Sequence, residues 1–91
     1  MSLIVLERRD TLAVIRLNRP GKLNSLTREM ILELSDLFRN FASDDSLRAV
    51  ILTGSGEKAF CVGTDIGELS DSDSVAAQQI SERGQALCNL I

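Results

Sequence analysis

The sequence predicts a small α/β fold with the element order β-β-α-β-loop-α, and three observations lead to it. Two β-rich apolar segments, residues 3–8 and 11–17, open the chain and are separated by only two residues. Apolar residues then recur at helical spacing after Thr27. A short and almost wholly apolar segment, residues 49–53, follows that helix, so the second and third strands are expected to pair in parallel through a helical crossover.

The two opening strands are expected to form a hairpin whose turn is Arg9-Asp10, although this pair lacks the usual glycine. Side chains alternate between the faces of a strand, and in residues 11–17 one face is wholly apolar and the other mostly so. This pattern is typical of a strand that is covered on both sides.

The first helix is predicted to begin at Thr27, whose side chain can accept from free backbone N–H groups as an N-cap. Its apolar stripe must lie on another element, and the stripe consists of Met30, Ile31, Leu34, Leu37, Phe38 and Phe41. A polar segment, residues 43–46, ends this helix. A last helix is expected from Ser74 to the end of the chain, with an apolar side that has no later strand to cover it.

The composition excludes several classes of function. A chain of 91 residues makes one domain at most, and 44% hydrophobic residues argue against disorder. The net charge of −3 and the lack of Tyr and Trp weigh against nucleic-acid binding. No apolar run approaches the ~20 residues of a membrane span. Without histidine and with two unclustered cysteines we expect no metal site, free thiols, and a cytoplasmic or organelle-matrix location.

The loop of residues 59–65 is the most informative segment, because it follows a buried strand and precedes a predicted helical turn. Gly63 permits a positive φ or a close approach of the backbone. The N–H groups of Thr64 and Asp65 would then be free to face an anion or a developing enolate. The alternative is an ordinary strand–helix turn with Asp65 as an N-cap, and the residues alone favour this alternative.

Three other features have a simpler alternative. The basic turn of residues 19–24 would suit a phosphate, but charges at turns are usually only solvated. Cys61 and Cys88 are interpreted as small buried hydrophobes rather than nucleophiles, since the chain offers no histidine partner. Asp65 and Glu68 would suit a pair of acid–base carboxylates, but a cap and a solvated charge are the favoured interpretation.

Three segments together resemble the crotonase superfamily, the enoyl-CoA hydratase/isomerase family, in order and spacing. They read IRLNRPGKLNSL at 15–26, AVILTGSG at 49–56 and AFCVGTDIGEL at 59–69. The resemblance implies that the chain, residues 1–91, is the N-terminal part of one crotonase-like domain. The expected fold is then the opening ββα-β-α portion of a crotonase-like spiral, truncated relative to the family.

The resemblance also implies roles for individual residues. Thr64 matches the position whose backbone N–H is one donor of the oxyanion hole. Gly67 stands where several relatives have Lys or Arg, and Ser25 where many have Ala. The residues expected to contact the acyl-CoA are Lys22, Leu23, Asn24, Ser25, Gly63, Thr64, Asp65, Ile66 and Gly67.

The function implied is that of a lyase or isomerase that stabilises a thioester enolate, with coenzyme A as part of the substrate and no covalently bound cofactor. Family members tend to form homo-oligomers, so one is expected here. Their second oxyanion donor and acid–base carboxylates lie further along the chain, and we therefore expect these 91 residues alone to be inactive. The alternative is a non-catalytic module that binds CoA or serves in assembly.

Overall fold

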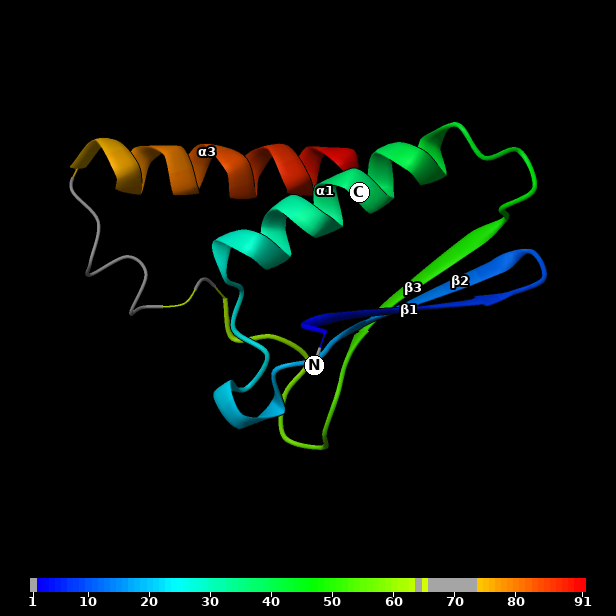
Figure 1. Cartoon of the computed structure of the whole chain (residues 1–91), viewed down its shortest axis with the longest axis horizontal. Helices are drawn as coiled ribbons and strands as arrows, with labels where there is room; N and C mark the ends of the chain where they lie inside the picture. The colour runs from blue at the N-terminus through cyan, green and yellow to red at the C-terminus, as the bar shows by residue number, and fades with distance from the viewer. Residues whose placement is uncertain (1, 64, 66–73) are drawn as a thin grey trace.

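The computed structural model describes residues 2–63, 65 and 74–91. Strands β1 (Ile4–Arg9), β2 (Leu12–Leu17) and β3 (Ala49–Gly54) form one sheet in the order β1-β2-β3. Helices α1 (Arg28–Ala42) and α3 (Ser74–Leu90) lie on the same side of that sheet (Figure 1). A 3₁₀ turn, η1 (Pro20–Lys22), follows β2. The predicted α/β order is confirmed.

The pairing of the strands is also as predicted. β1 and β2 are antiparallel, with Ile4 opposite Leu17, and β2 and β3 are parallel, with Leu17 beside Gly54. The hairpin turn lies one residue later than expected, at 10–11, because Arg9 still pairs with Leu12. Asp10 takes the positive φ of 55° that this tight turn requires, which aspartate tolerates better than most residues.

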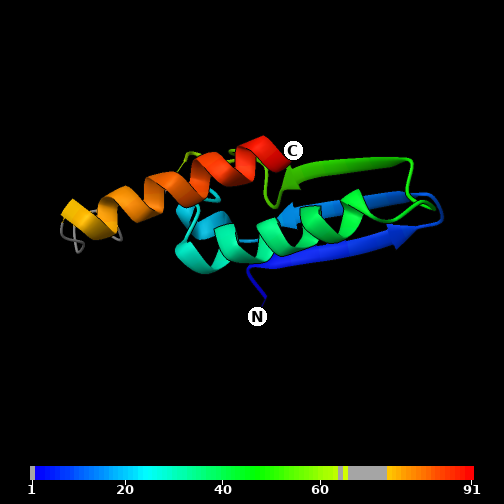
Figure 2. The same cartoon turned by 90° about the horizontal axis from the view of Figure 1, so that it is seen from above.

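α1 begins as predicted, since the Thr27 hydroxyl accepts from the Met30 N–H at 3.2 Å. Its apolar stripe packs on the helix-facing side of β1 and β2, and Figure 2, a view from above, shows the helix passing over the strands. The rings of Phe38 and Phe41 meet edge to face with centroids 5.8 Å apart. The core cluster consists of Ile4, Ile15, Leu17, Met30, Ile31, Leu34, Phe38 and Leu87.

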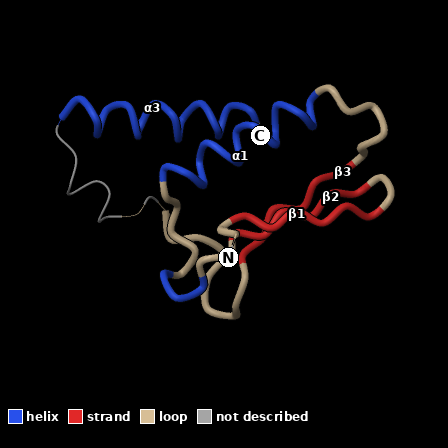
Figure 3. The backbone as a smooth tube through the Cα atoms, viewed as in Figure 1, coloured by secondary structure: helices blue, strands red, loops and turns tan. Residues whose placement is uncertain are grey.

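The expectation that α3 would lack a partner is wrong for the part of the helix whose side chains are described. Leu87 is 4% exposed, because α3 packs against α1 rather than on the sheet (Figure 3). Ile91, just after the helix, is exposed. Among the described residues no helix is long and apolar enough to cross a membrane.

Candidate functional site

Two segments far apart in sequence meet beyond the carboxyl ends of β2 and β3. The Leu26 N–H donates to the Gly63 carbonyl at 2.8 Å, and the Asp65 N–H donates to the Leu26 carbonyl at 2.9 Å. This is the hydrogen-bond pattern of a short parallel pairing. The N–H of Asp65 is therefore occupied, and the expectation that it would be free to face an anion is wrong.

Gly63 has a φ of 100°, so the positive φ predicted for this glycine is confirmed. Nothing lies within 4 Å of the position that a Cβ would take there, so the backbone conformation rather than space is what requires glycine. In the facing turn, Leu23 and Asn24 also have positive φ, 54° and 57°, which tightly reverses the chain after η1.

Arg19 joins the two segments through a single nitrogen. Its Nη1 donates to the Ser25 carbonyl at 3.0 Å, to the Ser25 hydroxyl at 2.9 Å and to Oδ2 of Asp65 at 2.8 Å. The Arg19 and Asp65 side chains are 18% and 19% exposed. Since the Arg19 guanidinium is used inside the chain, the phosphate-binding interpretation of the basic turn can rest only on Lys22, which is exposed.

Asn24 is fully buried, and its side-chain amide makes three hydrogen bonds. Its Oδ1 accepts from the Arg19 N–H at 3.0 Å, and its Nδ2 donates to the carbonyls of Ser55 and Ala59 at 2.9 and 3.0 Å. Any contact between Asn24 and a ligand would therefore come from its backbone. The amide fixes the turn against the loop that leaves β3.

Gly54 makes this close approach possible. A Cβ at Gly54 would lie 2.5 Å from Asn24 Nδ2 and closer still to the Phe60 carbonyl oxygen, so no other residue fits there without movement of the backbone. Three segments therefore meet at one point, and each of them belongs to one of the three sequence motifs.

A cavity of about 350 Å³ opens beside this junction. It is lined by Pro20, Leu23, Asn24, Ser55, Gly56, Glu57, Lys58 and Ala59. Leu23 is 40% exposed, whereas Ser25 is buried and does not line the cavity. Lys58 was not predicted as a site residue, although a cation directly before the loop of residues 59–65 could have indicated it.

Several expected site residues lie outside the described part of the chain, namely Thr64, Ile66, Gly67 and Glu68. Cys61 packs against the core as expected, and its Sγ accepts from the Gly63 N–H at 3.4 Å. Cys88 is exposed, so its interpretation as a buried hydrophobe is wrong. It follows the buried Leu87 in α3 but does not share its buried side of the helix. Within the described residues no cluster of side chains is suited to hold a metal ion.

The ion pair between Arg19 and Asp65 is the main feature that sequence reasoning missed. The two residues are 46 positions apart, and neither belongs to a short motif for ion pairing. A signal did exist, because both follow strands predicted to be parallel neighbours, and the carboxyl ends of such strands lie at the same edge of a sheet.

Comparison with known proteins agrees with these motifs. Residues 7–91 match the enoyl-CoA hydratase/isomerase family. The chain is 34% identical to a crotonyl-CoA hydratase of Syntrophomonas wolfei over 97% of its own length and 34% of the relative's. It is 37% identical to the mitochondrial 3-hydroxyisobutyryl-CoA hydrolase of Bos taurus, over 87% of its length and 20% of that protein's.

The fold comparison agrees. The crystal structure of an enoyl-CoA hydratase from Bacillus anthracis superimposes with a TM-score of 0.94 at 27% identity, covering 99% of this chain and 35% of that one. The chain thus spans about a third of the length of the Syntrophomonas wolfei and Bacillus anthracis proteins. On the family match and the superposition together, the chain belongs to the enoyl-CoA hydratase/isomerase family and has the opening portion of the crotonase fold.

Proposed function

We propose that this chain forms one side of an acyl-CoA site in an enzyme that stabilises a thioester enolate, of the lyase or isomerase type. In this proposal the turn of residues 22–25 lies along the pantetheine and adenine, and the segment 63–67 lines the thioester. Coenzyme A enters as part of the substrate. The observation that carries the proposal is the junction itself, in which the Leu26 pairing and the Arg19 contacts hold both segments together.

The chemistry proposed for the site is electrostatic. The backbone N–H of Thr64 donates to the thioester oxygen, where negative charge develops as the enolate forms. The neighbouring groups support this assignment, because the Gly63 carbonyl and the Asp65 N–H are already bonded to Leu26. A main-chain donor held between two fixed groups needs little reorganisation when charge develops.

Binding of butyryl-CoA, a saturated thioester that cannot be hydrated, tests the proposal directly. We expect amide shifts in the NMR spectrum of the ¹⁵N-labelled chain to change at residues 22–25 and 63–67 on titration. Free coenzyme A should shift the first group but affect the second much less, since it lacks the thioester. Shifts that are absent, or that fall only on the α3 side of the molecule, would contradict the proposed site.

Two substitutions separate the backbone donor from a side-chain donor. Gly63→Val cannot keep the φ of 100° without strain, so it should misplace the donor and weaken butyryl-CoA binding. Thr64→Ala leaves the main chain in place and should change affinity less than about twofold, because one lost side-chain hydrogen bond would cost more. If Thr64→Ala abolishes binding while Gly63→Val spares it, the hydroxyl is the working group and the proposal fails.

Turnover distinguishes this proposal from a non-catalytic CoA-binding or assembly module. We expect the 91 residues to bind butyryl-CoA without hydrating crotonyl-CoA, because the acid–base carboxylates of the family are expected further along the chain and Asp65 is committed to Arg19. Hydration clearly above a protein-free control would show that the acid–base groups lie within this chain. Saturable binding of free coenzyme A with no gain for the thioester would instead favour the non-catalytic module.

Self-association is a further part of the proposal. α1 covers one face of the sheet, and on the other face Ile51, 48% exposed, lies beside Val14. Val5 adds to that face and is 38% exposed. Such an apolar surface favours association, so light scattering should give a mass above 9.9 kDa. A mass of one chain at high concentration would count against the homo-oligomer.

A further inference from the structure

We propose that Arg19 is a positioning residue, which fixes the backbone of Gly63 and Asp65 against Leu26 without contacting the substrate. The inference rests on the proposed function only for its effect on ligand affinity. Its effect on the backbone stands on the contacts of Arg19 alone.

The placement of Arg19 is unusual for a charged residue of a turn. Its guanidinium points back into the chain, and Nη1 reaches both Ser25 and Asp65. Of the two residues that Nη1 contacts, Ser25 directly precedes Leu26 in sequence, and Asp65 follows Gly63 by two positions. The contact therefore spans the same two segments as the Leu26 pairing and lies directly beside it.

Two features make Arg19 suited to this role. The backbone N–H of Arg19 donates to the side-chain oxygen of the buried Asn24, so both the main chain and the guanidinium of Arg19 are held in place. Its partner Asp65 is about four-fifths buried, and an ion pair with limited access to water is less screened than one at the surface. The ion pair of Asp65 with Arg19 thus fixes the chain two residues after Gly63.

Hydrogen exchange of the two amides in the pairing, Leu26 and Asp65, tests the backbone effect. In Arg19→Met these amides should exchange about 10- to 100-fold faster relative to the Ile15 amide in the central strand, the factor expected for loss of hydrogen bonds to a charged group. Arg19→Lys keeps a cation and should restore part of the protection. Asp65→Asn gives a second route to the same result if Arg19→Met does not fold.

The chain offers a matched control at the other end of the sheet. Arg8 also pairs with an aspartate, Asp44, at 2.9 Å, so Arg8→Met removes the same kind of group. It should leave the relative exchange rates of Leu26 and Asp65 unchanged. Equal acceleration by both variants, or none in Arg19→Met, would overturn the proposal.

Affinity for butyryl-CoA tests whether the positioning serves the site. Arg19→Met should weaken binding about tenfold or more, Arg19→Lys less, and Arg8→Met not at all. If Arg19→Met exchanges faster but binds butyryl-CoA with full affinity, Arg19 has only a structural role. The proposal that Arg19 positions the loop for the ligand is then refuted. If the unmodified chain binds no butyryl-CoA, the proposed function fails, and the exchange rates still decide whether Arg19 holds the loop.

Discussion

An arginine pairs with an aspartate of a distant loop at each end of the parallel pair β2 and β3. At the carboxyl ends Arg19 meets Asp65 at 2.8 Å, and at the amino ends Arg8 meets Asp44 at 2.9 Å. The distances are nearly equal, but the surroundings differ. The first pair is 18% and 19% exposed, and the second is 38% and 32% exposed.

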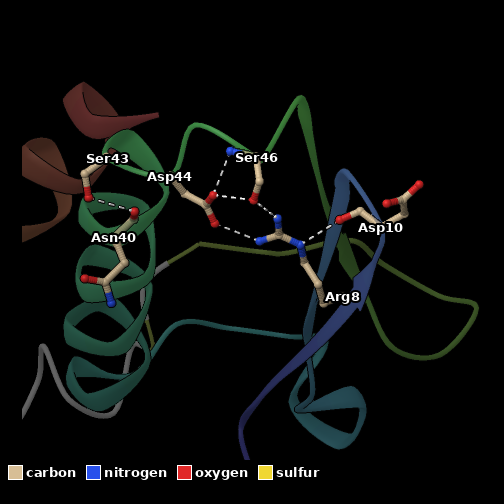
Figure 4. A network of polar contacts seen from close by, with 6 residues as sticks. All are labelled: Arg8, Asp10, Asn40, Ser43, Asp44 and Ser46. Carbon is tan, nitrogen blue, oxygen red and sulfur yellow. Dashed lines mark hydrogen bonds and ion pairs between the residues drawn. The ribbon is translucent and has the colours of Figure 1, made fainter.

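The network at the amino ends, drawn in Figure 4, is the more exposed of the two. Arg8 also donates to the Ser46 hydroxyl at 2.8 Å and to the Asp10 carbonyl at 3.0 Å. The Ser46 hydroxyl donates in turn to Asp44 at 2.6 Å. Hydrogen bonds from the Ser46 hydroxyl, then from Arg8, lower the pKa of Asp44 from 3.8 to about 2.

The comparison teaches that the same pair of side chains can serve two purposes. The Arg8 network connects the hairpin to the exposed loop between α1 and β3. The Arg19 network is joined through the Arg19 N–H to a packed junction, where Asn24 leaves no space for a side chain at Gly54. Substitutions at the two ends should therefore differ in their effect on stability.

Gly54→Ala should give the largest loss of stability. The added methyl group would overlap the Asn24 amide and the Phe60 carbonyl, neither of which can move freely. We expect the free energy of unfolding to fall by about 3 kcal/mol in urea titrations, the upper part of the range for overpacking. Gly84→Ala, in α3 with nothing within 4 Å, is the control and should stabilise the helix by up to about 1 kcal/mol. A similar small effect at both positions would refute the packed junction.

Asn24→Ala should cost about 2–3 kcal/mol, because three groups lose their hydrogen bonds and alanine disfavours the φ of 57°. Asn24→Gly separates the two causes, since glycine accepts this φ but cannot replace the amide. We expect Asn24→Gly to recover no more than about 1 kcal/mol of the loss. Full recovery in the glycine variant would show that the amide hydrogen bonds contribute nothing.

Double-mutant cycles should rank the two ion pairs. We expect a coupling of about 2 kcal/mol between Arg19 and Asp65, because these charged hydrogen bonds are largely shielded from water. The coupling between Arg8 and Asp44 should be smaller and should fall more steeply when salt is raised. Thermal melts of the single and double variants at low and high salt give both quantities, and equal couplings would remove the distinction between the ends.

The pH dependence of Asp44 should give the smallest effect. Its pKa of about 2 in the folded chain lies below its ordinary 3.8, so the folded state binds protons less readily and Asp44 stabilises the fold only when ionised. The stability advantage over Asp44→Asn should be complete above about pH 4 and vanish as the pH falls towards 2. An NMR titration of the Asp44 carboxyl with a midpoint near 3.8 would contradict this.

The order and pairing of the strands and helices follow from local sequence patterns. The apolar runs, the Thr27 cap and the helical stripe after it each have a local cause, and each fixes one element or its boundary. The parallel pairing of β2 with β3 follows from a helix between two buried strands. The positive φ at Gly63 was also predictable, because the residue type itself allows it.

Which polar groups already have hydrogen-bond partners depends on the folded chain and could not be predicted from local patterns. The turn before α1 looked basic and open, yet Arg19 bonds to Asp65 across 46 residues, and the Asp65 N–H bonds to Leu26. The sequence places Leu87 on an apolar side of α3 without showing that α1 covers it. Local patterns report the preferences of a segment, whereas occupation of a donor or burial of a face depends on residues that are distant in sequence and meet only in the folded chain.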